Sequence, residues 1–314
     1  MGSMGMPETI SERWLYALKP ASWPKLLVPM LLGQGLGIAA SRPSGALSGL
    51  LFGVVFTLLD LIFIVLLNDW FDRDVDALKR RMFPHSGSPK TIPDGILAPW
   101  HLLGAGLLAA ALAALVSLGA GLAIHPGLFP AGITCLVLFA AYSAPPLHLN
   151  YRGGGELLEM LGVGVALPWL NAYALSKRML FPELACLLGF SLLSMASAIA
   201  SGMSDEESDR KGGKRTVVTR FGNARARTWV ERLVPAGALT WIATALLVPR
   251  ALPLGAALLA ASVTLWGWLR VRRCSSAAVT NAFAAQAAYK QELHRAIWGG
   301  GLLLAAAFAV RGAI

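Results

Sequence analysis

Charged residues are scarce in this sequence: they occupy 14% of its 314 positions, whereas hydrophobic residues occupy 56%. The mean hydropathy is correspondingly high, at +0.60. The length alone would allow two soluble domains, but this composition excludes an ordinary soluble protein. The shortage of charge therefore predicts an integral membrane protein in contact with lipid.

Cysteine is also rare, and its three residues, Cys135, Cys186 and Cys274, lie far apart in the chain. None belongs to a CxxC motif and none has a histidine nearby. This spacing indicates neither a disulfide framework nor a zinc site. We expect the three cysteines to serve as small apolar residues within helices.

Polar segments divide the apolar stretches into nine candidate spans, each suited to a helix that crosses a bilayer. Several spans are rich in glycine and alanine, which lets neighbouring helices approach closely. The predicted fold class is therefore all-α, a polytopic membrane helical bundle that forms a single domain over 1–314. The spans are expected at 23–40, 46–67, 98–122, 126–143, 155–175, 182–203, 230–249, 251–269 and 295–313.

Basic residues are sorted between alternate connections of this bundle. With the N-terminus placed in the cytoplasm, the inside segments hold 22 of the 27 lysines and arginines, and the outside segments hold 5. Because cytoplasmic loops carry such an excess, we expect a cytoplasmic N-terminus, in a bacterial inner (cytoplasmic) membrane. The sorting also accounts for the net charge of +10, so nucleic acid is not expected as a partner. Nothing in the sequence indicates an oligomeric state.

The segment N-D-W-F-D-R-D-V-D places four carboxylates and an amide directly after an apolar run. A carboxylate at the centre of a bilayer costs roughly 2.5–3.5 kcal/mol, so these groups are expected at the mouth of a helix. Asn68, Asp72 and Asp76 are four residues apart, so they share a face with Asp69, while Asp74 points elsewhere. Clustered carboxylates favour a divalent cation, and Mg²⁺ takes its further ligands from substrate phosphates. We interpret the segment as a Mg²⁺–diphosphate site; the alternative is a solvated helix end.

A second acidic cluster follows the sixth span. Asp205 and Asp209 lie one helical turn apart, whereas Glu206 and Glu207 turn away from their face. The basic, glycine-containing stretch 210–216 comes next and is suited to holding phosphate oxygens. Both clusters fall in inside connections, so they are expected on the same side of the membrane. The alternative is a positive-inside loop with incidental acids.

Between the clusters, two prolines end the fourth span, and Tyr142 stands at its mouth. Its ring either faces a developing carbocation or lies in the aromatic belt at the membrane surface. In the first span, Lys19 and Gln34 are candidates to line a cavity, although a buried glutamine also satisfies a neighbouring helix.

These motifs resemble the UbiA superfamily of intramembrane prenyltransferases. The first cluster is similar to the superfamily motif NDxxDxxxD, the second to DxxxD, and K-T-I-P-D-G at 90–95 to the superfamily's RP-L/I-P-S-G stretch. The segments Y-S-A-P-P-L-H-L-N-Y-R-G-G-G-E and G-K-R-T look closest to the 1,4-dihydroxy-2-naphthoate polyprenyltransferases. The resemblance covers the first seven spans.

The resemblance implies a Mg²⁺-dependent enzyme that transfers a polyprenyl group from an allylic polyprenyl diphosphate to a lipophilic or aromatic acceptor, such as a quinone precursor. It implies a cavity capped on the cytoplasmic side and open to membrane lipid. By position, the residues implied to hold Mg²⁺ and diphosphate are Asn68, Asp69, Asp72, Asp76, Asp205 and Asp209. The cations implied beside the diphosphate are Arg73, Lys90, Lys214 and Arg215.

The chain also departs from this pattern. His148 and Asn150 stand at substrate-binding positions where the family usually has Arg and Lys, and Ser201 and Ser204 replace Asn and Arg of the naphthoate enzymes. These departures leave other acceptors open: a hydroxybenzoate, chlorophyllide, a quinolone or a glycerol-phosphate lipid. A cation-coupled transporter is the alternative from another class, although a transporter more often places its charges on broken helices near the midplane.

Overall fold

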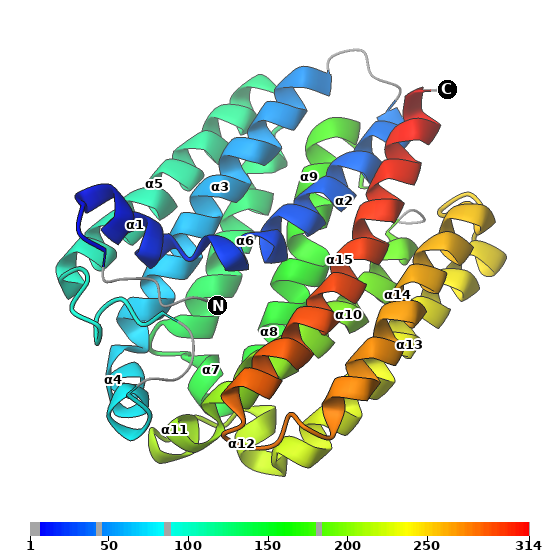
Figure 1. Cartoon of the computed structure of the whole chain (residues 1–314). Coiled ribbons are helices and arrows are strands. Elements are labelled where there is room, and N and C mark those ends of the chain that lie inside the picture. Colours follow the sequence, from blue (N-terminus) through cyan, green and yellow to red (C-terminus); the bar gives the residue numbers. More distant parts are fainter. Residues whose placement is uncertain (1–6, 42–45, 85–88, 180–183, 314) are drawn as a thin grey trace.

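The described residues of this computed structural model are 7–41, 46–84, 89–179 and 184–313. Within these ranges every regular element is helical, and the long helices form one tilted bundle (Figure 1). The long helices are α2 (Pro24–Ser41), α3 (Ala46–Phe71), α5 (Pro99–Ala123), α6 (Leu128–Ser143), α10 (Ala185–Gly202), α13 (Asn223–Leu247), α14 (Leu254–Ser275) and α15 (Phe283–Ala313). One further membrane helix is divided into α8 (Gly155–Leu161), the π-helical turn η2 (Gly162–Ala166) and α9 (Leu167–Ser176).

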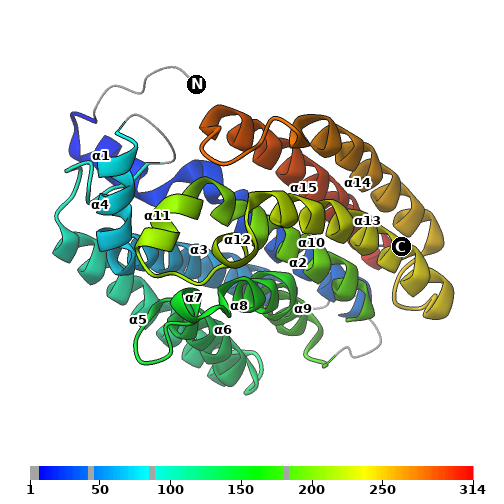
Figure 2. The same cartoon turned by 90° about the horizontal axis from the view of Figure 1, so that it is seen from below.

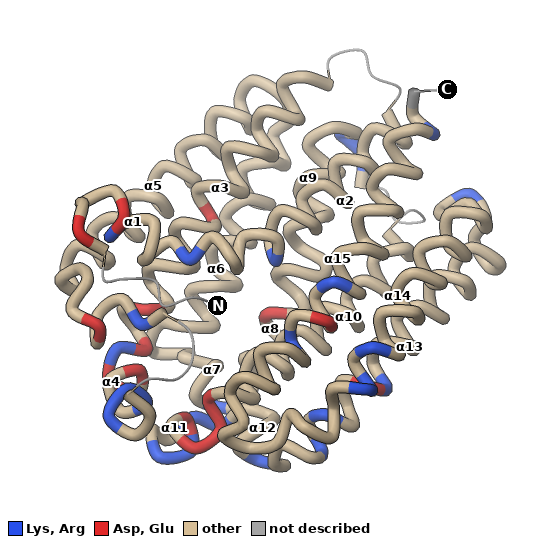
Figure 3. The backbone as a smooth tube through the Cα atoms, in the orientation of Figure 1, with Lys and Arg blue, Asp and Glu red and all other residues tan. Residues whose placement is uncertain are grey.

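Short helices gather at one end of the bundle, where the view from below shows α4, α7, α11 and α12 together (Figure 2). Most charged residues lie toward that end (Figure 3). The short elements are α1 (Ile10–Leu18), η1 (Pro20–Ser22), α4 (Arg73–Met82), α7 (Leu149–Arg152), η3 (Met203–Asp205), α11 (Glu206–Lys211) and α12 (Val217–Phe221).

In the described part of the chain, seven helical segments are long and apolar enough to cross a membrane. The prediction of an all-helical membrane bundle is thus confirmed. Two other predicted spans correspond to α2 and to α6, which has 16 residues. The number of nine spans and the cytoplasmic N-terminus stay predictions. The predicted start of the sixth span at 182 lies outside the described residues.

Two of the helices extend well beyond the spans predicted for them. Helix α15 begins at Phe283 rather than at 295, and α13 begins at Asn223 rather than at 230. The apolar pattern stops at the first charged residues, but backbone hydrogen bonding continues through them. Hydropathy therefore located the apolar part of each helix and missed its polar continuation.

Two of the three buried apolar cores join the long helices of the bundle, and the third, around Leu66 and Leu102, is smaller. The larger core joins α2, α10, α13, α14 and α15, and it buries Trp241 and Phe190. The other joins α3, α5, α6 and α9, around Phe56 and Leu170. Helix α2 contributes to both cores, so it connects the two halves of the bundle.

The junction between α3 and α4 decides how the first acidic cluster is presented. Helix α3 ends at Phe71, and Asp72 departs from helical geometry, with φ −88° and ψ 2°. Even so, the amide of Asp72 donates to the carbonyl of Asn68 at 2.9 Å, and the amide of Asp76 to the carbonyl of Asp72 at 2.8 Å. Because hydrogen bonds of helical spacing cross the junction, the three residues keep their common face.

The second acidic cluster sits where α10 passes through the 3₁₀ turn η3 into α11. Helix α11 ends at Lys211, and the next residue, Gly212, lies in close contact with α4. A β-carbon added to Gly212 would lie 2.5 Å from a methyl carbon of Val75, so only glycine allows this approach. The contact brings the two acidic segments, which are far apart in the sequence, to the same end of the bundle.

Candidate functional site

A cavity of about 330 Å³ opens among α2, α3, α6, the α8–α9 helix, α10 and α15. Both acidic clusters contribute to its lining, as the sequence analysis expected. The residues from the predicted site that line it are Asn68, Asp69, Asp72, Asp76, Lys90, Tyr142, Asn150, Asp205, Asp209 and Lys214.

In the first cluster each buried carboxylate is paired with a lysine. The ammonium of Lys90 lies 2.5 Å from an oxygen of Asp76, and Lys19 forms an ion pair with Asp69. The hydroxyl of Thr91 also donates to Asp69, at 2.7 Å. The segment at 90–95 therefore supplies both a cation and a hydrogen-bond donor to the cluster. The role of Lys90 beside a diphosphate stays a prediction.

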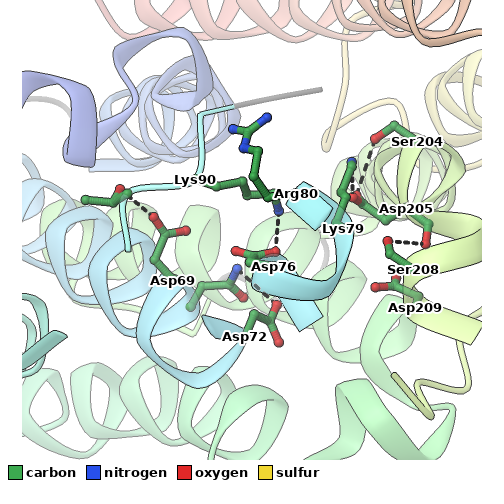
Figure 4. Close-up of polar contacts among 12 residues, drawn as sticks. Asp69, Asp72, Asp76, Lys79, Arg80, Lys90, Ser204, Asp205, Ser208 and Asp209 are labelled. Atoms are coloured by element: carbon green, nitrogen blue, oxygen red, sulfur yellow. Dashed lines mark hydrogen bonds and ion pairs between the residues drawn. The ribbon is translucent and has the colours of Figure 1, made fainter. Parts of the chain in front are cut away.

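Lysines also connect the first cluster to the second. The ammonium of Lys214 lies 2.7 Å from Asp72 and 3.9 Å from Asp209. Lys79 of α4, which is almost fully buried, forms an ion pair with Asp205 of η3. Figure 4 shows Lys79 and Lys90 reaching toward the aspartates of the two clusters. The two acidic patches thus meet at one site.

Burial and neighbouring charges shift the pKa values of the groups that lie outside the membrane spans. Burial raises the pKa of Asp76, and the positive charge of Lys90 only partly offsets this. Burial would lower the pKa of Lys90, but Asp205 and Asp76 outweigh it and raise the value. The pKa of Lys214 is raised in the same way, since Asp72 and Asp209 overcome its burial. Both lysines therefore stay protonated at neutral pH.

The segment that carries Lys90 is anchored through Asp94. Two nitrogens of the Arg80 guanidinium donate to its carboxylate at 2.6 and 2.7 Å, and the Tyr16 hydroxyl donates at 2.6 Å. Burial raises the pKa of Asp94, but these hydrogen bonds outweigh burial and hold it below its usual value. Burial, and to a smaller extent the hydrogen bond to Asp94 and its negative charge, raise the pKa of Tyr16 to about 12. This anchor ties α1, α4 and the 90–95 segment together behind the site.

The chemistry of the clusters suits Mg²⁺. Asp72, Asp76, Asp205 and Asp209 offer only oxygen atoms, and the side chain of Asn68 adds a carbonyl oxygen, the donor type that Mg²⁺ prefers. Within the described ranges, no three carboxylate, histidine or cysteine side chains converge as the ligands of one ion do. The donor set therefore fits a Mg²⁺ that also takes ligands from water and substrate phosphate.

Three residues of the predicted site lie outside the cavity lining. The guanidinium of Arg73 donates to the carbonyl of Trp70 at 2.9 Å and stacks on its indole ring. Arg215 is exposed, and its backbone amide donates to the carbonyl of Tyr151. The ring of His148 packs 4.0 Å from that of Tyr151, and burial lowers its pKa. We leave these three side chains out of the proposed site.

The other predicted positions face the cavity. Asn150, at the start of the connection to α8, is buried in its lining. Tyr142 also lines it, and its ring stacks with that of Phe139 at 6.1 Å between centroids. These rings provide an aromatic surface at the boundary between the charged and the apolar parts of the cavity.

Sequence reasoning missed several polar residues at the cavity. Lys25 of α2 and Glu159 of α8 form an ion pair at 2.5 Å, and Lys290 of α15 also faces the space. Tyr151 donates to Asp72 at 3.2 Å. Asp60, a carboxylate inside an apolar run, was the one among them with a clear sequence signal, because a charged group at membrane depth is costly.

The cavity has two parts with different chemistry. We call the first the polar end; it comprises Asn68, Asp69, Asp72, Asp76, Lys90, Asp205, Asp209 and Lys214. We call the second the apolar wall; it comprises Asp60, Ile64, Cys135, Leu138, Phe139 and Leu167. A ligand with a charged head and an apolar body matches this division.

Fold and site together define an integral membrane protein of the all-helical class, with a charged cavity at one end of its bundle. The chain belongs to the UbiA prenyltransferase family, which it matches over residues 26–290.

Among curated relatives, a chlorophyll synthase of Arabidopsis thaliana is 27% identical over 70% of this chain and 57% of its own length. A 1,4-dihydroxy-2-naphthoate octaprenyltransferase of Mycobacterium tuberculosis is 24% identical over 73% of this chain and 77% of its own. The chain thus spans less than two thirds of the chlorophyll synthase that it matches.

Solved structures share the fold. A UbiA homolog from Archaeoglobus fulgidus bound to DMAPP and Mg²⁺ has a TM-score of 0.68 at 18% identity, covering 91% of this chain and 99% of its own. The same homolog was also solved with GPP and Mg²⁺. At such identities the likeness supports the architecture, and the substrate must be argued from the site.

Proposed function

We propose that this protein transfers a polyprenyl group from an allylic polyprenyl diphosphate to an aromatic acceptor, in a reaction that depends on Mg²⁺. The family membership and the relatives that carry out prenyl transfer support this reaction class. The A. fulgidus homolog, which binds prenyl diphosphates with Mg²⁺, supports the donor and the metal.

One observation carries the proposal: two acidic clusters from distant segments meet at one end of a cavity that also has an apolar wall, beside further polar residues such as Lys25, Glu159 and Lys290. A diphosphate with Mg²⁺ matches the carboxylates and lysines of the polar end. An isoprenoid chain matches the apolar wall.

The first part of the proposed reaction breaks the bond between the allylic carbon and the diphosphate oxygen, whose electron pair leaves with pyrophosphate. Bound Mg²⁺ supplies a Lewis acid for this leaving group. Lys90 and Lys214, which stay protonated, are placed to share the negative charge that develops. Asn68, Asp72, Asp76, Asp205 and Asp209 are the proposed metal-side ligands.

The second part joins the allylic cation to a ring carbon of the acceptor, and the ring then loses a proton or, for a naphthoate, carbon dioxide. The stacked rings of Tyr142 and Phe139 present an aromatic face to a cation that forms beside them. The apolar wall excludes water, which would otherwise capture the cation as an alcohol.

We further propose a dihydroxynaphthoate as the acceptor and the cytoplasmic face of a bacterial inner membrane as the place of reaction. The naphthoate octaprenyltransferase relatives and the motif at 142–156 support the acceptor. The concentration of lysine and arginine at the end of the bundle where α4, α11 and α12 lie supports the orientation (Figure 3).

The test uses purified protein in lipid nanodiscs with geranylgeranyl or farnesyl diphosphate and Mg²⁺. Pyrophosphate release is measured, and products are identified by mass spectrometry against a panel of 1,4-dihydroxy-2-naphthoate, 4-hydroxybenzoate and chlorophyllide. A prenylated naphthoate-derived product is expected. A prenylated product from another member of the panel would refute the naphthoate assignment, and absence of pyrophosphate release with every acceptor would refute the reaction.

A further inference from the structure

The apolar wall contains one ionisable carboxylate, Asp60, in the middle of α3. Its side chain is 4% exposed, and it lines the same cavity as Ile64 and Asn68. These three residues follow one another at intervals of four, so they lie along one face of the helix. At a rise of about 1.5 Å per residue, Asp60 lies roughly 12 Å deeper in the bundle than Asn68.

Asp60 differs from the other carboxylates of the lining in that its buried oxygen Oδ1 has no hydrogen-bond partner among the described residues. Asp69, Asp72, Asp76, Glu159, Asp205 and Asp209 each have a lysine within ion-pair distance. Glu156 accepts a hydrogen bond from the amide of Val217 at 2.6 Å. Among the residues that the structure describes, none forms a hydrogen bond with Oδ1 of Asp60.

Packing alone does not account for a carboxyl group at this position. A buried polar group without a partner destabilises a protein, and an unpaired acid inside a membrane helix is costlier still. In the apolar wall, Leu138 and Leu167 have no hydrogen-bond donor in their side chains. The thiol of Cys135, which interacts electrostatically with Asp60, forms no hydrogen bond with its Oδ1. A leucine there would continue the wall without this cost, so the carboxylate points to a ligand that satisfies it.

We propose that Asp60 binds the aromatic acceptor by accepting a hydrogen bond from one of its ring hydroxyl groups. This inference rests on the proposed function and adds a specificity-determining residue to it. The polar end takes the diphosphate, so a ring held by Asp60 lies on the opposite side of the allylic carbon. The hydrogen bond selects acceptors with a free hydroxyl group over acceptors whose oxygens are methylated.

The alternative occupant of the space around Asp60 is the isoprenoid tail. A tail has no hydrogen-bond donor and would leave the carboxylate unsatisfied. Binding of the tail would be favoured by an apolar side chain at position 60. Asp60→Leu therefore separates the two occupants, since it weakens acceptor binding in one case and strengthens donor binding in the other.

The variants are Asp60→Leu, which removes the acceptor oxygen, and Asp60→Asn, which keeps one and nearly preserves the shape. Asp74→Asn is the matched control, because Asp74 is exposed on α4 and faces away from the cavity. Binding of 1,4-dihydroxy-2-naphthoate and of its 1,4-dimethoxy analogue is measured by equilibrium dialysis without donor. KM for geranylgeranyl diphosphate and for the naphthoate is measured separately.

We expect Asp60→Leu to weaken dihydroxynaphthoate binding by ~10–100-fold, because it leaves a buried ring hydroxyl without its acceptor. KM for the donor should stay unchanged, and Asp60→Asn should recover part of the affinity. The wild-type protein should prefer the dihydroxy probe, and Asp60→Leu should lose this preference. Asp74→Asn should match the wild type in every measurement.

Equal binding of the dihydroxy probe by wild type and Asp60→Leu would overturn the inference, as would a lower donor KM in Asp60→Leu with unchanged acceptor binding. If Asp60→Leu does not fold, an equal affinity of the wild type for both probes overturns it just as well. Binding without pyrophosphate release would instead refute the proposed function and leave the role of Asp60 supported. A wild type that binds neither probe overturns the inference.

Discussion

The two parts of the cavity treat buried charge in opposite ways. At the polar end, carboxylates and lysines neutralise one another in pairs, as in Lys90 with Asp76 and Lys214 with Asp72. In the apolar wall, Asp60 is buried, and none of the described residues forms a hydrogen bond with its Oδ1. A charged ligand can replace either partner of such an ion pair. The carboxyl group of Asp60, in contrast, is suited to a ligand that donates a hydrogen bond.

This difference between the polar end and the apolar wall explains how one cavity could bind two substrates. When a diphosphate binds with its metal ion, the lysines can pair with the phosphate oxygens and the carboxylates with the metal. The polar end therefore needs no unpaired charge before the ligand binds. An aromatic acceptor with a hydroxyl group contributes a single directional hydrogen bond. The following predictions are arranged from the largest expected effect to the smallest.

Removing a carboxylate of the polar end should have the largest effect. Asp72→Asn and Asp209→Asn each lose an anionic oxygen beside the proposed metal, so Mg²⁺-dependent pyrophosphate release should fall by roughly 100-fold or more. The rate is measured at saturating donor with increasing Mg²⁺. Asp74→Asn serves as the control of equal chemistry. Full turnover by either purified variant would remove that residue from the site.

Removing a lysine should leave a buried carboxylate uncompensated. Lys90→Gln should lower the stability by up to roughly 3–5 kcal/mol, because Asp76 then stays ionised without a partner. The folded-state pKa of Asp76 is already raised, so its ionisation destabilises the fold as pH rises, and the loss should shrink at acidic pH. Thermal unfolding in detergent between pH 5 and pH 8 measures it.

The exposed Lys211→Gln provides the comparison, since it removes the same charge outside the cavity. Added Mg²⁺ should raise the unfolding temperature of Lys90→Gln more than that of the wild type, because the cation replaces the missing ammonium. An equal shift in both proteins would contradict the placement of Mg²⁺ beside Asp76.

The anchor behind the site should contribute a smaller, pH-dependent stability. Asp94→Asn should cost about 1.5–3 kcal/mol at pH 7, since it weakens the charge-assisted bonds from Arg80. The folded-state pKa of Asp94 is lowered from 3.8, so the contribution is present above that value and is lost as pH falls through the lower folded value. Unfolding temperatures that converge for both proteins below pH 4 would agree with this; a constant difference would contradict it.

Two of the positions that depart from the family pattern, His148 and Asn150, should give the smallest effects, and these effects should be unequal. Asn150 lines the cavity. Asn150→Lys should therefore lower KM for the donor several-fold, because it adds one positive charge that the diphosphate can contact. His148 packs outside the lining, so His148→Arg should leave that KM within about twofold. Donor KM values decide the comparison, and a larger effect at His148 would reverse our placement of the two side chains.

Much of the site could be predicted because its residues repeat at helical intervals. Asn68, Asp72 and Asp76 share a face in the structure, as their spacing predicted, and Asp74 is exposed. Spacing could not predict which cations face the cavity. Arg73 lies next to Asp72 in sequence but turns to Trp70, whereas the distant Lys19 pairs with Asp69.

For Asp60, too, the sequence could not predict which side chains lie next to it. Its place inside an apolar run was visible in the sequence, yet nothing there showed whether a lysine from another helix would neutralise it. Only the packing of α3 against its neighbours decided that no described side chain does. The sequence marks a costly residue, and the structure tells whether the cost is offset.

The sequence by itself determined that the protein is a helical membrane bundle and which residues supply its carboxylates, because hydropathy and helical spacing act over short stretches of chain. The tertiary structure decided that the two acidic clusters share one cavity, which lysines pair with them, and that Asp60 faces the same space. Those outcomes depend on contacts such as that of Gly212 with Val75, which join segments far apart in the sequence. Local patterns carry no information about such contacts, since they arise only when the helices pack.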